Sequence, residues 1–115
     1  RERRLQIDAL LGGRWLRHPE LNGHVVLCGD FNAPGRSRNL RRIDDLLRNV
    51  ATPRDGSVKA PELNTCSSRI PMRRIDHVFI SEAVRVRSVS VPRNRLTQVA
   101  SDHLPIVVDL WVGEP

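Results

Sequence analysis

The chain has 115 residues, of which 39% are hydrophobic and 28% charged, and these values predict one compact globular domain instead of a disordered chain. No apolar run approaches the roughly 20 residues of a bilayer-spanning helix, and no apolar stretch follows the basic amino terminus, so neither a transmembrane segment nor a signal peptide is expected. The net charge of +6 suits a phosphate-bearing partner, although scattered arginines equally fit a compositional bias. An aromatic content of 3% argues against a dedicated binder of single-stranded nucleic acid.

The first half of the chain predicts two helices and one strand. Residues 2–17 have the apolar spacing of a helix, which a pair of glycines can end early. The apolar run 24–28 predicts a buried strand, in which Cys28 is a buried small side chain. Ser37 is a suitable N-cap for a helix that reaches about Val50. The cysteines form no disulfide or zinc pattern, so a reducing, cytoplasmic location is the default expectation.

The second half predicts three strands and two loops. Residues 51–72 contain prolines and little periodicity, which indicates a long loop, and residues 74–80 alternate as a strand does. The valines of 84–91 change sides midway, which indicates a bulge or a break. Residues 92–101 predict a second polar loop, and 104–112 predict a central strand buried on both faces. The order of elements favours a mixed α/β sheet with helices covering one face.

A first polar cluster follows the strand predicted at 24–28. Asp30 and Asn32 are two residues apart, so in extended chain both face the same way while Phe31 anchors the other side. A carboxylate beside an amide can orient a water nucleophile and hold a phosphoryl oxygen. The alternative is a helix-capping turn, because Asp and Asn are common in such turns.

Two further polar clusters lie within or next to the later strands. Asp76 falls inside an apolar strand, where an ionised carboxylate needs a partner, and both His103 and Arg74 are candidates. A carboxylate-oriented His103 would make a general base, and Asp102 beside it is a hard oxygen ligand suited to Mg²⁺ or Mn²⁺. A strand-entry turn is the alternative for this last pair. Together the clusters supply what metal-activated hydrolysis of a phosphate ester needs.

In their order and spacing these clusters resemble the motifs of the endonuclease/exonuclease/phosphatase superfamily. The resemblance covers nearly the whole chain, including a preceding helix that carries Arg4 and Gln6. It implies an α/β (α+β) fold that is half of a four-layer α/β sandwich, with a mixed, mainly antiparallel sheet. The matching segments are Gly29-Asp30-Phe31-Asn32, Arg74-Ile75-Asp76-His77-Val78 and Ser101-Asp102-His103-Leu104-Pro105.

The resemblance also implies a role for each matching residue. Asp30 would activate the attacking water and help bind Mg²⁺ or Mn²⁺, and Asn32 would bind the scissile phosphate. Asp76 would orient His103, which would act as a general base or a phosphate ligand. Asp102 would help bind the divalent metal.

Two further positions are candidates for substrate contact, and each has a structural alternative. Arg74 could meet a phosphate, but a salt bridge explains it equally well. His77 stands where relatives often carry an aromatic residue, and it is interpreted mainly as a packing residue, with substrate contact as the lesser alternative. The residues that line the remainder of such a site do not identify the substrate, which could be nucleic acid, phospholipid or a small phosphate ester.

The resemblance is confined to the second half of the superfamily domain. The metal-binding Glu expected in the first half has no counterpart before Asp30, so residues 1–115 are expected to be the carboxyl-terminal part of a longer domain or a chain that completes itself as a homodimer. A phosphoester hydrolase is the leading hypothesis. The alternative is a non-catalytic basic half-domain that binds nucleic acid or other anionic partners.

Overall fold

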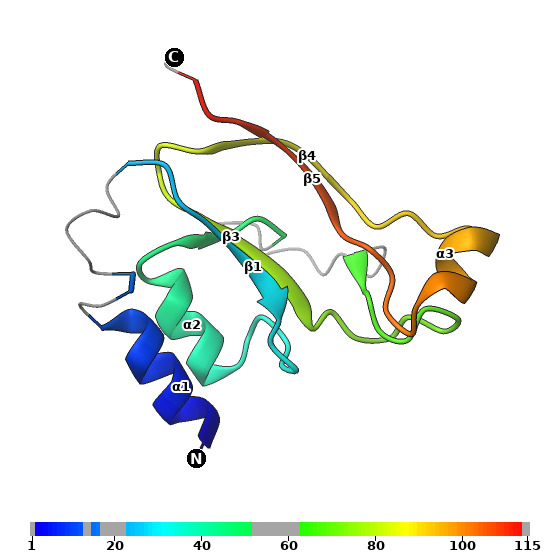
Figure 1. Ribbon diagram of the computed structural model, residues 1–115, viewed down its shortest axis with the longest axis horizontal. Helices are drawn as coiled ribbons and strands as arrows, with labels where there is room; N and C mark the ends of the chain where they lie inside the picture. The colour runs from blue at the N-terminus through cyan, green and yellow to red at the C-terminus, as the bar shows by residue number, and fades with distance from the viewer. Residues whose placement is uncertain (1, 13–14, 17–22, 52–62, 114–115) are drawn as a thin grey trace.

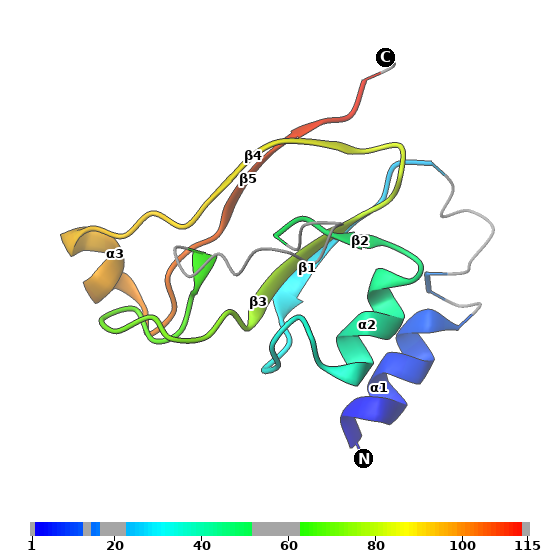
Figure 2. The same ribbon diagram turned by 180° about the vertical axis from the view of Figure 1, so that it is seen from behind.

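The computed structural model describes residues 2–12, 15–16, 23–51 and 63–113, which form helices and antiparallel strands (Figures 1 and 2). Figure 1 shows α1 and α2 side by side at one end of the molecule and α3 at the other. In chain order the elements are α1 Glu2–Leu11, β1 Val26–Asp30, α2 Arg38–Asp44, β2 Arg48–Asn49, β3 Asp76–Ile80, β4 Arg85–Ser90, α3 Arg95–Ala100 and β5 Val107–Trp111.

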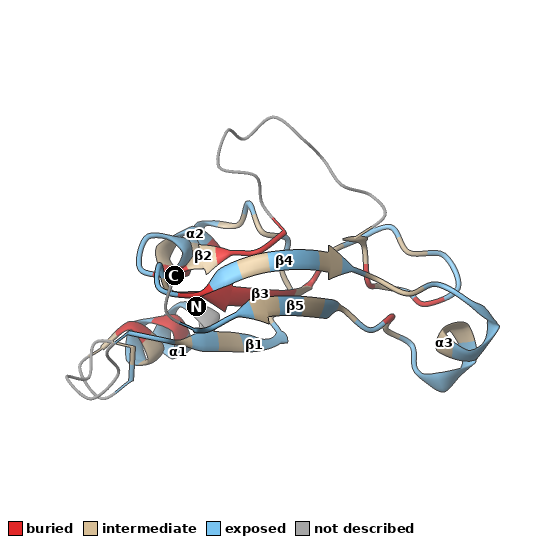
Figure 3. Ribbon diagram, turned by 90° about the horizontal axis from the view of Figure 1, so that it is seen from above, coloured by how far each residue is buried: buried red, intermediate tan, exposed pale blue. Residues whose placement is uncertain are grey.

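The described part of the chain forms three layers around the buried strand β3. One sheet has the order β1-β3-β2 and a second consists of β4 and β5, and the pairing in both is antiparallel. Residues of β3 alternate between the two sides: Phe79 packs on the helices, whereas Val78 and Ile80 pack against the β4–β5 sheet. Figure 3 shows β3 as the most buried strand of the molecule. The predicted α/β class with helices on one face is therefore confirmed, and the β4–β5 sheet covers the other face.

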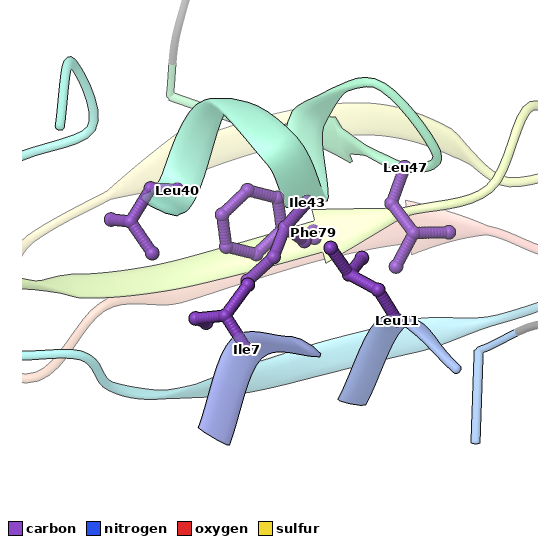
Figure 4. Close-up of a cluster of buried hydrophobic side chains, with 6 residues drawn as sticks. All are labelled: Ile7, Leu11, Leu40, Ile43, Leu47 and Phe79. Atoms are coloured by element: carbon purple, nitrogen blue, oxygen red, sulfur yellow. The ribbon is translucent and has the colours of Figure 1, made fainter. Parts of the chain in front are cut away.

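The helix-side core is a cluster of six buried apolar side chains (Figure 4). Ile7 and Leu11 from α1 meet Leu40 and Ile43 from α2 over the ring of Phe79, which is fully buried. Burying a side chain of this size contributes about 2–3 kcal/mol to folding. This packing fixes β3 beneath the helices and thereby fixes where the strand begins, at Asp76.

The two long helices begin and end close to the predicted signals. The first ends at Leu11, directly before Gly12, so the early end predicted from the glycine pair is confirmed. Ser37 caps α2 and accepts a hydrogen bond from the amide of Leu40 at 3.4 Å, as predicted. The prediction that this helix reaches about Val50 is wrong. It ends at Asp44 because Arg48 and Asn49 pair with β3 instead.

Three further predictions are corrected by the structure. Residues 92–101 are not all loop, because Asn94 caps α3 through a capping box with Thr97. The strand predicted at 104–112 is shorter, and β5 pairs with β4 alone among the described strands, with 47% of Trp111 exposed. It is therefore not a central strand. Cys28 is exposed, because it lies on the face of the sheet opposite the helices, where the β4–β5 sheet packs on Val78 and Ile80 of β3 and not on β1.

Other predictions are confirmed or fall partly outside the described residues. The register of β4 and β5 shifts between Val86 and Ser88, which is the bulge predicted from the valines. Both cysteines are free. Of the loop predicted at 51–72, positions 52–62 lie outside the described residues, and Cys66 forms isolated bridges with Arg73 and His103. In the part of the chain that the structure describes, no helix is both long and apolar enough to cross a bilayer.

Candidate active site

The site begins with two carboxylates that the sheet register places opposite each other. Asp30 is the last residue of β1, Asp76 is the first residue of β3, and the two are direct antiparallel partners. Asp30 leaves 42% of its side chain exposed and Asp76 leaves 19%. Strand pairing alone therefore brings together acidic residues that are 46 positions apart in the sequence.

The segment before β5 brings His103 to this pair. The backbone amide of Leu104 donates to the carbonyl oxygen of Thr65 at 2.7 Å, and the amide of Ser68 donates to the carbonyl oxygen of Asp102 at 2.8 Å. Cys66 and His103 form a bridge between these two hydrogen bonds. Residues 65–68 thus hold the backbone around His103 in place through these hydrogen bonds.

The carboxylate of Asp76 accepts two short hydrogen bonds. Nδ1 of His103 lies 2.7 Å from Oδ2 of Asp76, and the hydroxyl of Thr65 donates to the same oxygen at 2.6 Å. Of the two partners predicted for Asp76, His103 is confirmed. Arg74 donates from Nη1 to the carbonyl oxygen of Ala51 at 3.0 Å. Thr65 was not predicted as a site residue, because nothing in a loop sequence marks a threonine that folding buries completely.

The electrostatics of His103 follow from this arrangement. The hydrogen bond to Asp76 raises the pKa of His103 above its usual 6.5, and the negative charges of Asp76, Asp30 and Asp102 act in the same direction. Because Nδ1 faces Asp76, Nε2 faces Asp30, whose Oδ2 lies 3.9 Å away. The imidazole is therefore held between two carboxylates, with one nitrogen directed toward the exposed acid.

Asp30 and Asn32 form a tight turn in place of an extended pair. The backbone amide of Asn32 donates to Oδ1 of Asp30 at 2.8 Å, and Asn32 has a φ of 51°, a left-handed conformation that asparagine tolerates better than most residues. The prediction of extended chain here is wrong, and the helix-capping alternative is wrong as well, because the turn precedes Ser37, which is the N-cap of α2. Phe31 anchors the turn as predicted, because its ring packs edge-on against Phe79 at a centroid distance of 5.6 Å.

His77 lies on the opposite side of β3 and is 1% exposed. Its Nε2 lies 2.8 Å from the carbonyl oxygen of Ala33, so this nitrogen carries the proton, and Nδ1 accepts from the side-chain amide of Asn49 at 3.1 Å. Burial lowers the pKa of His77 below its usual value of 6.5. Asn49 was not predicted from the sequence, and the two-residue strand that carries it has no sequence signal.

The donor atoms of Asp30, Asp76 and His103 all lie within 4.8 Å of one another, as a metal-binding cluster requires. Two carboxylates and an imidazole suit a divalent cation such as Mn²⁺ or Mg²⁺ in donor type. Asp102 is exposed and does not belong to this group, although its charge acts on His103. Oδ2 of Asp76 already accepts two hydrogen bonds, so Asp30 is the carboxylate more open to an ion.

Comparison with known proteins decides the family. The model of the endonuclease/exonuclease/phosphatase family matches residues 1–103. The chain belongs to this family. No curated protein matches the chain in sequence.

Two solved structures share the fold. An endonuclease/exonuclease/phosphatase from Bacteroides vulgatus is 21% identical with a TM-score of 0.76, and the alignment covers 96% of this chain. A conserved protein of unknown function from Enterococcus faecalis V583 is 15% identical with a TM-score of 0.72, over 95% of this chain. The chain spans 44% of the length of each structure. At these identities the comparison establishes the fold of the chain and not its substrate.

Proposed function

We propose that residues 1–115 form the carboxyl-terminal part of a phosphoester hydrolase domain that uses Mg²⁺ or Mn²⁺. The observation that carries this proposal is the convergence of Asp30, Asp76 and His103 from three separate segments of a chain that belongs to the family. A turn or a salt bridge explains each residue alone. Neither explains why all three meet with one imidazole nitrogen bonded to Asp76 and the other directed at Asp30.

We assign His103 to the reacting phosphate through Nε2. Asp76 accepts from Nδ1, so it fixes the ring orientation and stabilises the protonated form. The raised pKa of His103 keeps a larger fraction of the side chain protonated near neutral pH, where Nε2 can donate to a phosphoryl oxygen. The neutral fraction can accept a proton from water at the same atom. Asp76 is therefore a positioning residue and His103 a catalytic one.

We assign Asp30 to the attacking water and to the metal. Oδ1 accepts from the amide of Asn32, which leaves Oδ2 directed toward His103 and solvent. The exposed side chain of Asn32, presented by the left-handed turn, would donate to the phosphate. A divalent ion held by Asp30, in the cluster that it forms with Asp76 and His103, would supply charge stabilisation and a water of lowered pKa, and the exposed carboxylate of Asp102 would add negative charge beside His103.

We revise the expected roles of His77 and Arg74. Both ring nitrogens of His77 are engaged by protein groups, so we assign it to holding the turn at Ala33 instead of binding substrate. Arg74 packs beside the same turn, since a Cβ atom added to Gly35 would lie 3.4 Å from its Nη2. We therefore treat Arg74 as a support of the turn that carries Asp30 and Asn32.

The experiment that tests the proposal is hydrolysis of bis-p-nitrophenyl phosphate by the 115-residue chain with Mg²⁺ or Mn²⁺. We expect metal-dependent turnover that falls in Asp30→Asn and in His103→Ala. Asp109→Asn is the matched control, because this exposed carboxylate lies on β5, outside the cluster of Asp30, Asp76 and His103, and forms a long ion pair with Arg87 at 3.9 Å. Turnover that is unchanged in Asp30→Asn would contradict the proposal.

A further inference from the structure

We propose that the surface formed by residues 67–73 and 93–100, which include α3, docks on an anionic phospholipid bilayer. We call this surface the arginine-apolar rim. Membrane binding does not depend on the activity proposed above. The further inference that the substrate is a phosphoester at a membrane surface rests on that activity. The rim lies at the end of the molecule that is far from α1 and α2 (Figures 1 and 2).

The rim exposes four large apolar side chains. They are Ile70 at 68%, Met72 at 77%, Leu96 at 73% and Val99 at 63% relative exposure. Leu96 and Val99 are three residues apart and so share one face of α3, a helix with no buried residue. A helix on the surface of a globular domain normally turns its apolar face inward, so an outward-facing pair indicates an interaction surface.

The two segments of the rim are joined by direct hydrogen bonds. The hydroxyl of Ser68 donates to the carbonyl oxygen of Gln98 at 3.0 Å, and Nη2 of Arg93 donates to the carbonyl oxygen of Arg69 at 3.2 Å. The exposed apolar residues therefore belong to one supported structure and not to two unconnected loops.

The charge of the rim has a single sign. Residues 63–75 and 83–101 contain no Asp or Glu, and the rim exposes four arginines: Arg69, Arg73, Arg93 and Arg95. This composition favours an anionic partner. A second copy of the chain is disfavoured as the occupant, since two such surfaces facing each other would repel.

The apolar residues decide between lipid and nucleic acid. Basic side chains beside exposed aliphatic ones suit the boundary between phosphate headgroups and acyl chains. Nucleic acid would be met by aromatic side chains for base stacking, and residues 63–75 and 83–101 contain no Phe, Trp or Tyr. An anionic bilayer fits both the charge and the apolar exposure.

The rim is continuous with the candidate active site. The amide of Ser68 bonds to the carbonyl oxygen of Asp102, and Cys66 forms a bridge with His103. A bilayer bound at the rim would therefore lie directly beside His103, which is where a headgroup phosphoester would have to be presented.

The test is cosedimentation of the 115-residue chain with vesicles of phosphatidylcholine alone or mixed with phosphatidylglycerol, at low salt. We expect binding to the anionic vesicles only. Loss of roughly five-fold in affinity is expected for each of Arg69→Gln and Arg95→Gln, since one basic residue near an anionic surface is worth about that factor. The double variant Met72→Gln with Leu96→Gln should also bind at least five-fold more weakly, because it removes apolar area from the lipid boundary.

Matched controls are Arg87→Gln and Val112→Gln, exposed positions outside the rim, which should bind as the unchanged chain does. Asp30→Asn should bind vesicles normally even if it is inactive, so failure of lipid binding and failure of the proposed activity are separate results. No binding to anionic vesicles would overturn the proposal. The proposal would also be overturned if the apolar variant bound the vesicles as tightly as the unchanged chain. It would be overturned as well if duplex DNA carrying the same total charge displaced the chain from the vesicles.

Discussion

His77 and His103 both lie at the end of β3 that begins with Asp76, yet their surroundings give them opposite properties. His77 is buried, and its nitrogens are engaged by Ala33 and Asn49. His103 keeps about a quarter of its side chain exposed (24%) and faces carboxylates on both sides. Burial lowers the pKa of His77, whereas the hydrogen bond to Asp76 raises the pKa of His103.

The difference shows that the protein uses one residue type for two purposes. A neutral, fully bonded imidazole can hold a backbone turn but cannot exchange protons with a substrate. A partly exposed imidazole beside acids can do so, because its protonated form is stabilised and one nitrogen remains directed outward. Separate substitutions at the two positions should therefore affect different measurements.

The largest expected effect is on turnover at His103. His103→Ala should lower the rate of metal-dependent phosphodiester hydrolysis roughly 10²–10⁴-fold, because it removes the proton-holding group at the site. Its free energy of unfolding should change by less than about 1 kcal/mol, since the side chain is partly exposed. Steady-state kinetics and urea unfolding measure the two quantities. A rate within a factor of three of the unchanged chain would contradict the assignment, with His24→Ala as the control at an exposed histidine.

The converse is expected at His77. His77→Ala should lower the free energy of unfolding by about 3 kcal/mol, because it leaves the amide of Asn49 and the carbonyl oxygen of Ala33 buried without this partner. Urea unfolding is the measurement. If His77→Ala were as stable as the unchanged chain, the structural role of this histidine would be wrong.

A smaller effect is expected at Thr65, whose hydroxyl bonds to the carboxylate of Asp76. Thr65→Val keeps the shape of the side chain and removes the donor, so the free energy of unfolding should fall by about 2 kcal/mol. Thr65→Ser restores the hydroxyl and should recover most of the loss. Equal stability of the Val and Ser variants would show that the hydrogen bond contributes nothing.

The smallest effects concern pH, and the two histidines have opposite signs. The lowered pKa of His77 means that the unfolded chain binds this proton more readily, so stability should fall as the pH drops below 6.5. The raised pKa of His103 gives a contribution that is complete below 6.5 and is lost as the pH rises through the raised pKa. Measurements of the free energy of unfolding from about pH 5 to about pH 8 should show both the fall at low pH and the fall at high pH. Asp76→Asn should remove only the loss of stability at high pH. If that loss were unchanged in the variant, the pairing of Asp76 with His103 would be contradicted.

Much of the site could be predicted from the sequence because its residues stand at strand ends. Asp30 follows one apolar run and Asp76 lies inside another, and both runs were predicted as strands, so the approach of the two carboxylates followed from pairing those strands. Ser37 was found because an N-cap is a local signal. Local signals of this kind can be recognised in the sequence without knowledge of the tertiary structure.

The remainder depended on contacts between distant segments. Thr65 contacts Asp76, and Asn49 contacts His77, only because residues 65–68 and β2 pack against distant segments of the chain. The Asn94–Thr97 capping box that starts α3 was a local signal, but it lacks the usual Glu or Gln three residues after the cap. The apolar face of β5 predicted a buried central strand, since sequence periodicity reports which faces are apolar and not which of them are covered.

The most direct test of the account is an NMR titration of the histidine ring signals with Mn²⁺ at substoichiometric concentration. The account predicts that the signals of His103 broaden well before those of exposed His24, and that Asp30→Asn abolishes this selective broadening whereas Asp109→Asn retains it. Broadening that is equal at His24 and His103, or that survives Asp30→Asn, would contradict a metal-dependent site at Asp30, Asp76 and His103.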